Sequence, residues 1–301
     1  MQRNISATED ILHKRSYRME KNIIGDLKGK CCVFTGGTGV LGKSMAGCLA
    51  GAGVKVAILG RNFEKSSQIA ASIASSSGGT VIGVGADVLD KNALEASRKT
   101  VNEKLGPVDI LVNAAGGNSP KATTAVETLE DKDLGQLDKT FFGLEIEAFR
   151  NVFDLNFIGT LLPTMVFGRD MVERKQGVII NVSSMNSYRP LTKIPAYSAA
   201  KASINNFTAW LAVHLAPQNI RVNAIAPGFF LTEQNRFLLV DQATGVLSAR
   251  GNKIITGTPM KRFGTPEELE GALLYLVSNM SKFVTGIVLP VDGGFSAYSG
   301  V

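Results

Sequence analysis

The chain has 301 residues, of which 45% are hydrophobic and 19% are charged, so it can bury a large core in one or two domains. It has no apolar run long enough to cross a bilayer, which takes about eighteen residues or more, and no compact apolar N-terminal segment followed by small residues. These absences argue against a membrane protein and a secreted one, and we expect a cytoplasmic protein without a membrane partner.

The charge and the metal-binding residue types exclude two further classes. The net charge is +6, but the basic residues are scattered, so nucleic-acid binding is not indicated. The two histidines are far apart and the chain has three cysteines, so no metal site is expected. Cys31 and Cys32 lie in a strand-like run and are predicted to be small buried side chains on opposite faces.

Residues 1–28 are polar and of mixed charge, and they show no apolar periodicity. We predict that they form a loose N-terminal extension. Met19 is a candidate for the natural start, because the sequence from there leads directly into the first apolar run.

From Lys30 onward, short apolar runs alternate with longer segments of helix-like composition. The runs are KCCVFT, VKVAILG, TVIGVGA, VDILVNAAG, GVIINVSS, IRVNAIAPG and GIVLPVDGG. Such Val/Ile-rich runs are typical of parallel strands buried on both faces. The pattern predicts one α/β domain over residues 29–301, a doubly wound, Rossmann-type, seven-stranded parallel sheet with helices on both faces.

The first run leads into the glycine-rich sequence TGGTGVLG at residues 35–42. Glycines at a strand-to-helix turn let the backbone approach a pyrophosphate, whose charge is stabilised by free amides at the helix N-terminus. A plain connection is the alternative. The candidate cofactor-binding residues here are Gly36, Gly37, Thr38, Gly39, Val40, Leu41 and Gly42.

Two further strand ends are candidates for contact with the adenosine half of a dinucleotide. The second run ends in Gly60-Arg61-Asn62, where an NAD-selective site usually has an acidic residue. Arg61 favours the 2′-phosphate of NADP over NAD, although an exposed arginine needs no ligand. Asp87 and Val88 follow the third run, where they either contact adenine or cap a helix that begins near Asp90.

Tyr197 and Lys201 stand four residues apart in a segment that Pro195 opens as a helix, so both side chains project from one face. A neighbouring ammonium lowers the high pKa of a tyrosine and suits it to proton transfer. Ser184 ends a strand and is expected to reach the same substrate oxygen.

These segments together resemble the short-chain dehydrogenase/reductase family over about residues 28–301. The motifs are TGGTGVLG, Asp87-Val88, NAAG at 113–116, Asn156 in VFDLNF, Ser184, YSAAK at 197–201, PGFFLT at 227–232 and VDGG at 291–294. The chain departs from the usual pattern in having Val40, rather than glycine, at the sixth position of TGxxxGxG.

The resemblance implies the roles of the site residues. Tyr197 is the acid/base, Lys201 holds the nicotinamide ribose, Ser184 orients the substrate oxygen and Asn156 supports a water in the proton relay. Both Tyr197 and Lys201 also bind the cofactor. The remaining implied cofactor contacts are Asn113, Ala114 and Gly116 beside the adenosine ribose, and Pro227, Gly228 and Thr232 near the carboxamide.

Within the family, long strings around the site are similar to bacterial D-mannonate oxidoreductases, which are D-fructuronate reductases. Two long connections, 117–143 and 229–263, are predicted to form the substrate pocket and its lid. Their polar residues, and those between Ser184 and Tyr197, favour a polyhydroxylated acid, although any one of them can be an ordinary surface residue. The candidate substrate-binding residues are Asn118, Asn186, Arg189, Lys193 and Gln234.

Several alternatives remain open. A gluconate 5-dehydrogenase or a 3-ketoacyl-carrier reductase would share the same cofactor and catalytic residues, and a dinucleotide-binding regulator without chemistry would share the fold. The family resemblance implies a dimer or tetramer assembled through the helices that hold Asn156 and Tyr197 and through the last strand. Phe141 and Phe142 are predicted to lie in the core.

Overall fold

The computed structural model describes residues 24–232, 236–241 and 244–300. Most of the predicted N-terminal extension, the candidate start at Met19 and the candidate substrate residue Gln234 lie outside these ranges.

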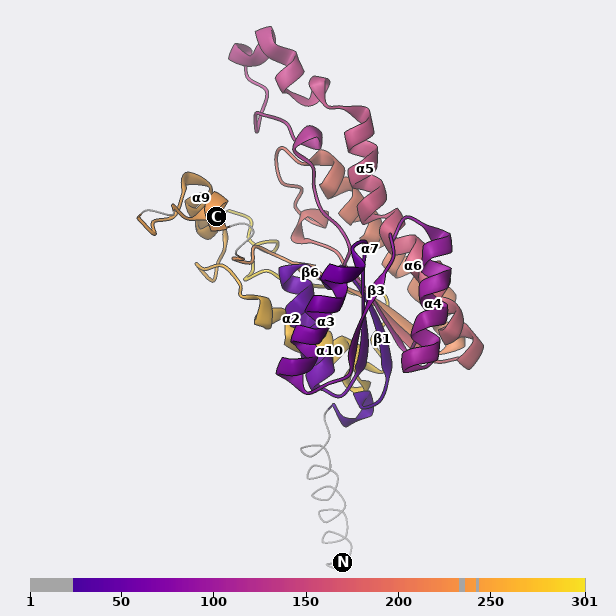
Figure 1. Ribbon diagram of the computed structural model, residues 1–301. Helices are drawn as coiled ribbons and strands as arrows, with labels where there is room; N and C mark the ends of the chain where they lie inside the picture. The colour runs from indigo at the N-terminus through magenta and orange to yellow at the C-terminus, as the bar shows by residue number, and fades with distance from the viewer. Residues whose placement is uncertain (1–23, 233–235, 242–243, 301) are drawn as a thin grey trace, which may run out of the picture.

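Seven parallel strands form one sheet, as the sequence predicted, and their order is β3-β2-β1-β4-β5-β6-β7 (Figure 1). The chain order reverses between β1 and β4, which opens a crevice at the carboxyl ends of these strands. The strands are β1 Cys31–Thr35, β2 Lys55–Gly60, β3 Val81–Gly85, β4 Ile110–Asn113, β5 Gly177–Val182, β6 Ile220–Pro227 and β7 Val288–Val291.

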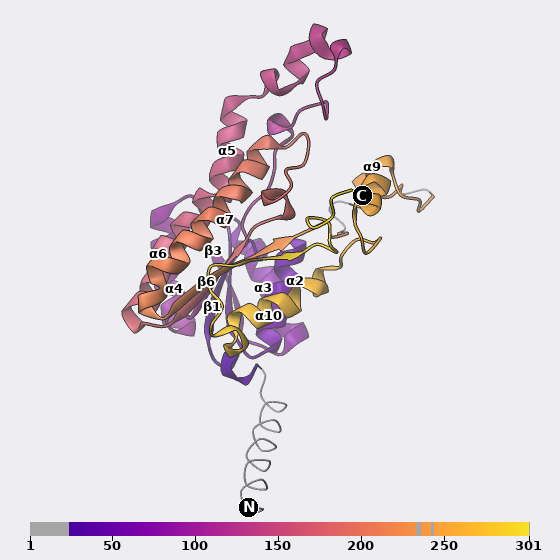
Figure 2. The same cartoon turned by 180° about the vertical axis from the view of Figure 1, so that it is seen from behind.

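Helices cover both faces of the sheet (Figures 1 and 2). One face carries α2 Val40–Gly51, α3 Phe63–Ser77 and α10 Glu270–Val277. The other carries α4 Lys91–Leu105, α6 Ile158–Arg174 and α7 Pro195–Leu215, and α5 Ile146–Asn156 packs against α6 and α7. Within the described residues, no helix is both long enough and apolar enough to span a bilayer.

The strands feed two separate cores because alternate side chains point to opposite faces. Cys32 packs in the cluster under α2 and α10, whereas Cys31 packs in the cluster under α4, α6 and α7. Both thiols are buried and free, which confirms their prediction as small buried side chains on opposite faces. Burial raises the pKa of Cys31 to about 12, so that thiol is unreactive at neutral pH.

Local signals set where the helices begin. The Asn62 side chain accepts a hydrogen bond from the Lys65 amide at 2.7 Å and caps α3, and Asp90 caps α4 in the same way. Pro195 is the first residue of α7, as predicted. The short 3-10 helices are η1 Gly25–Leu27, η5 Met185–Ser187, η6 Ala216–Gln218, η7 Pro266–Leu269 and η8 Asn279–Ser281.

The first long connection forms an arm that projects from the body beyond the start of α5 (Figure 1). It contains η2 Pro120–Ala122, η3 Asp131–Lys139 and η4 Phe141–Gly143. Phe141 and Phe142 are 63% and 69% exposed, so the prediction that they lie in the core is wrong. The arm stands clear of the sheet and has no second layer against which these rings can be buried.

The second long connection contains α8 Arg236–Leu239 and α9 Ala249–Gly257. It joins the rest of the fold where Phe230 pairs with Gly264. An ion pair between Lys253 of α9 and Glu127 links it to the base of the arm. The two long connections thus meet above the carboxyl edge of the sheet.

Candidate active site

A cleft of about 530 Å³ lies at the carboxyl ends of β1, β4, β5 and β6. Its lining residues come from six separate parts of the sequence. The predicted residues that line it are Gly36, Thr38, Gly39, Val40, Leu41, Gly42, Ala114, Gly116, Ser184, Tyr197, Lys201, Pro227, Gly228 and Thr232.

The glycine-rich turn at one end of the cleft has room for a pyrophosphate because four of its residues, at positions 36, 37, 39 and 42, are glycines. Gly36 has a φ of +70°, and a Cβ there would lie 2.4 Å from the carbonyl oxygen of Ala114. A Cβ on Gly42 would lie 2.4 Å from the carbonyl oxygen of Gly36. The helix α2 begins directly after Gly39, which offers no side-chain cap, so its first amides are available to an anion. These features fit a dinucleotide.

Two positively charged residues stand near the end of β2. Arg61 is exposed and does not itself line the cleft, whereas Lys65, one turn into α3, does. Asn62 caps α3 with its side chain, which leaves that side chain a structural role. Lys65 was not among the predicted cofactor residues.

Three residues predicted to contact the adenosine half have side chains in structural roles. The side chain of Asn113 is buried and donates to Thr164 Oγ1 at 2.9 Å and to Asn181 Oδ1 at 3.0 Å. The side chain of Val88 is buried in the core cluster under α4 and α6. Asp87 accepts from the Leu89 amide at 2.9 Å and shapes the turn before α4.

The predicted catalytic residues meet at the centre of the cleft. Ser184 follows β5 and is hydrogen-bonded to the Tyr197 phenol, which α7 presents. The Lys201 ammonium lies 5.6 Å from the centre of the Tyr197 ring and donates to the Val182 carbonyl at 2.7 Å. The four-residue spacing therefore places both side chains on the face of α7 that packs against the end of β5.

The pKa shifts of this group have identifiable causes. Desolvation raises the pKa of Tyr197, and the hydrogen bond with Ser184 partly offsets the rise. Burial lowers the pKa of Lys201 to about 8. The influence that opposes this rise comes from Ser184, and the expected lowering of the Tyr197 pKa by Lys201 stays a prediction.

Asn156 lies behind the cleft at the last turn of α5 and is fully buried. Its amide nitrogen donates to the Gly117 carbonyl at 2.7 Å and to the Val152 carbonyl at 2.8 Å. A Cβ on Gly116 would lie 2.5 Å from Asn156 Oδ1, so this position needs glycine. Asn156 therefore holds the cleft wall at Gly116 and Gly117.

The predicted substrate residues are dispersed, and none of those described lines the cleft. Asn118 is exposed and donates to Thr123 Oγ1, and the Lys193 carbonyl accepts from the Thr124 amide. Arg189 donates to the Ser296 carbonyl at 3.2 Å, which ties it to the C-terminal segment. Asn186 is buried beside Ser184, and its Oδ1 atom has no hydrogen-bond partner.

Several residues that line the cleft were not predicted. The sequence marks these residues only weakly as parts of a site, because the role of each depends on a residue that is near it in space or on a motif next to it in the chain. They are Met45, Lys65, Gly117, Val182, Ser183, Phe229 and Phe230.

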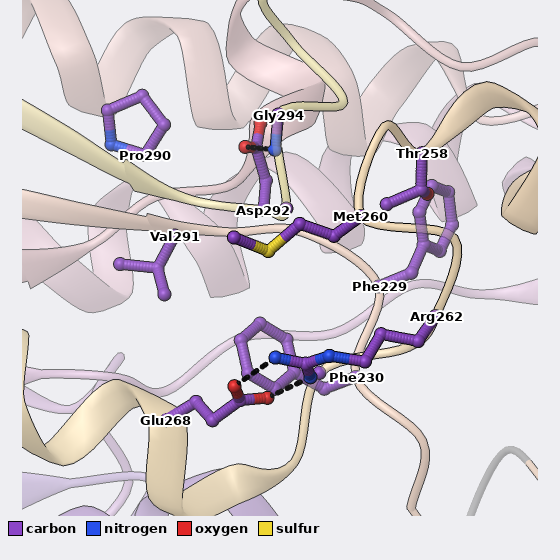
Figure 3. A pocket seen from close by; sticks show the side chains of 12 residues that line it. Phe229, Phe230, Thr258, Met260, Arg262, Glu268, Pro290, Val291, Asp292 and Gly294 are labelled. Carbon is purple, nitrogen blue, oxygen red and sulfur yellow. Dashed lines mark hydrogen bonds and ion pairs between the residues drawn. The ribbon is translucent and has the colours of Figure 1, made fainter.

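A second pocket of about 330 Å³ lies beyond Phe229 and Phe230, which also line the cleft. Figure 3 shows Arg262 and Glu268 pointing toward each other, joined by two hydrogen bonds of 2.6 Å. Asp292 accepts from the Gly294 amide at 2.9 Å. A Cβ on Gly228 would lie 2.6 Å from Asp292, so the PGFF and VDGG turns pack directly on each other. Residues of both turns line this second pocket.

Among the described residues, no group of three or more His, Cys, Asp or Glu side chains is placed to hold a metal ion.

Comparison with known proteins matches residues 38–296 to a family described as Enoyl-(Acyl carrier protein) reductase. The uncharacterized oxidoreductase UxuB of Bacillus subtilis (strain 168) is 53% identical over 277 residues, which are 92% of this chain and 98% of that protein. A Haemophilus influenza crystal structure with bound NAD, provisionally named a D-mannonate oxidoreductase, is 48% identical with a TM-score of 0.86, covering 93% of this chain and 100% of that one. A gluconate 5-dehydrogenase structure from Burkholderia cenocepacia J2315, in complex with NADP and tartrate, is 29% identical with a TM-score of 0.77, covering 92% and 100%.

Proposed function

We propose that this chain, which belongs to the short-chain dehydrogenase/reductase family and is an NAD(P)-dependent oxidoreductase, interconverts D-fructuronate and D-mannonate. The convergence of Ser184, Tyr197 and Lys201 on one cleft is the observation that carries the reaction type. The substrate is supported by the 48% identity to the Haemophilus protein provisionally named a D-mannonate oxidoreductase.

The chain's own residues account for the proton transfer. When bound, the nicotinamide cofactor supplies the hydride for reduction or accepts it for oxidation. Tyr197 donates the proton to the carbonyl oxygen of the substrate, and the raised pKa of its phenol keeps that proton in place at neutral pH. Ser184 orients the same oxygen. Lys201, held by the Val182 carbonyl, places a positive charge beside the phenol.

Asn186 does not itself line the cleft, but it lies directly behind Ser184, and we propose that a substrate hydroxyl reaches it. Its carboxamide oxygen is buried and without a partner two residues after Ser184, and a buried acceptor of this kind is stabilised by a hydroxyl donor. Replacing Asn186 by alanine is expected to raise the KM for the sugar acid. An unchanged KM would remove Asn186 from the substrate site.

The chain offers support for either dinucleotide. Arg61 and Lys65 at the end of β2 favour the 2′-phosphate of NADP. The Haemophilus relative holds NAD and the Burkholderia relative holds NADP. We propose that both cofactors bind and that the two cations add affinity for NADP.

The test is the loss of NADH and NADPH absorbance with D-fructuronate, run beside 5-ketogluconate and an acetoacetyl thioester, with Tyr197→Phe as the inactive control. Rapid turnover of D-fructuronate alone supports the proposal. Turnover of 5-ketogluconate instead would indicate a gluconate 5-dehydrogenase, and turnover of the thioester a 3-ketoacyl-carrier reductase. Dinucleotide binding with no turnover of any of the three would favour a regulator without chemistry.

We also propose that the protein assembles as a homodimer or homotetramer through the helices of its α7 face. Support comes from Trp210 and Val213, which are 58% and 77% exposed on α7. Gel filtration with light scattering is expected to give a molecular mass at least twice the chain mass of 32.0 kDa. A wild-type monomer would contradict the proposal, and Trp210→Glu should shift an oligomer toward monomer.

A further inference from the structure

The face of α7 that carries Tyr197 and Lys201 carries a third polar side chain one turn further on. Asn205 follows Lys201 by four residues, so the three side chains form one row along the helix. We propose that Asn205 is a positioning residue that fastens the segment around Ser184 to α7. This inference rests on the roles proposed for Ser184 and Tyr197.

One carboxamide ties both sides of the Ser184 segment. Ser183 Oγ donates to Asn205 Oδ1 at 2.5 Å, and Asn205 Nδ2 donates to Ser187 Oγ at 2.8 Å. Ser187 Oγ in turn donates to the Ser184 carbonyl at 2.6 Å. The amide of Asn205 is therefore satisfied by hydroxyls on each side of Ser184, and the chain of bonds ends on the backbone of Ser184 itself.

The segment needs such an anchor because the strand ladder ends just before it. The register of β5 with β6 runs to Val182, and Ser183 adds one more amide bond to the Ile225 carbonyl. Ser184 is extended, with φ −165° and ψ 155°, and is followed only by the single turn η5. Beyond the ladder, Asn205 joins both sides of Ser184 to α7, in addition to the bond between Ser183 Oγ and the Lys201 carbonyl at 3.3 Å and the bond between Ser184 and the Tyr197 phenol.

The placement of the hydroxyl matters because Ser184 Oγ has two partners. It accepts a hydrogen bond from the backbone N–H of Asn186 at 3.2 Å and is hydrogen-bonded to the Tyr197 phenol. A shift of the segment along α7 would lengthen the bond to the phenol, and displacements of about 1 Å in an active site can reduce turnover by about a hundredfold.

The test replaces Asn205 by leucine, which has a similar volume and cannot form either bond. Asn92 on α4 is exposed, and Asn92→Leu makes the same change away from both the catalytic residues and the α7 face. With the best substrate of the wild type, we expect Asn205→Leu to lower kcat by at least about tenfold while the KM for the dinucleotide changes little. Asn205→Asp keeps the acceptor for Ser183 and should recover part of the loss. Asn92→Leu should match the wild type.

A second readout does not depend on turnover. The ultraviolet titration of Tyr197 in cofactor-free protein is obtained as the difference between each protein and its Tyr197→Phe counterpart. Because the Ser184 bond lowers the Tyr197 pKa, Asn205→Leu should move this titration to higher pH. An unchanged titration would overturn the inference, as would reduced stability with unchanged kcat. Failure of the wild type on every ketone, with the titration shifted as expected, would instead count against the proposed function.

Discussion

Replacing Lys201 by methionine is expected to stabilise the cofactor-free protein at neutral pH and to remove most of its turnover. Lys201 is 4% exposed, and burial lowers its pKa from 10.5 to about 8. Each pKa unit corresponds to about 1.4 kcal/mol, so keeping the buried ammonium charged costs about 3 kcal/mol of folding free energy. Loss of the bond to the Val182 carbonyl offsets about 1 kcal/mol of that gain.

The net stabilisation of about 2 kcal/mol should depend on pH in a definite direction. Below pH 8, Lys201 is protonated in both the folded and unfolded states, and the wild type bears the whole cost. Between pH 8 and 10.5, the folded state has released a proton that the unfolded state keeps, so wild-type stability rises relative to the variant. The advantage of Lys201→Met should therefore be largest at pH 7, vanish near about pH 9.5 and reverse by about 1 kcal/mol toward pH 10.5.

Urea unfolding of both proteins without cofactor at pH 7, 8.5 and 10 measures this difference, provided that unfolding is reversible. A variant less stable than the wild type at pH 7 would refute the assigned cost of burial. A difference that does not change with pH would show that packing, rather than the charge, distinguishes the two side chains.

Three further predictions concern the same cleft. Gly36→Ala should weaken dinucleotide binding and destabilise the fold by about 1 kcal/mol or more, because the positive φ of Gly36 and its 2.4 Å approach to Ala114 exclude a Cβ. Calorimetric titration measures the binding and thermal unfolding measures the stability. Unaltered binding would contradict the role of the glycine-rich turn as a pyrophosphate site. Because the Tyr197 pKa is raised and that of Lys201 is about 8, oxidation should speed up as pH rises, since it needs the phenolate, whereas reduction should slow above pH 8 as the ammonium is lost; parallel pH profiles in the two directions would contradict these assignments. Arg61→Ala should weaken NADPH by about tenfold and leave NADH nearly unchanged in fluorescence titrations, and equal effects on both cofactors would remove the contact with the 2′-phosphate.

The sequence was sufficient for the seven strands and the glycine-rich turn. Parallel strands buried on both faces need continuous runs of apolar residues, and a backbone that closely approaches a ligand needs glycines. Both features are therefore visible in short stretches of sequence. The row of Tyr197 and Lys201 is local as well, because helical spacing alone puts residues four apart on one face.

Side-chain direction at the strand ends and in the long connections depended on the tertiary structure. The Asn113 side chain at the end of β4 points into a buried hydrogen-bond network. Arg189 donates to a backbone carbonyl of the C-terminal segment, 107 residues away in the sequence. Phe141 and Phe142 are exposed because the arm stands away from the sheet, although phenylalanine is a residue type usually found in protein cores.

Asn205 illustrates the same division. Its place on the helix follows from the sequence, but the two serines that its amide joins come from the end of another element, β5, which packing brings against α7. Spacing along one helix determines which side chains share a face. Only the packed structure determines what that face touches, because partners distant in sequence leave no periodic signal in the chain.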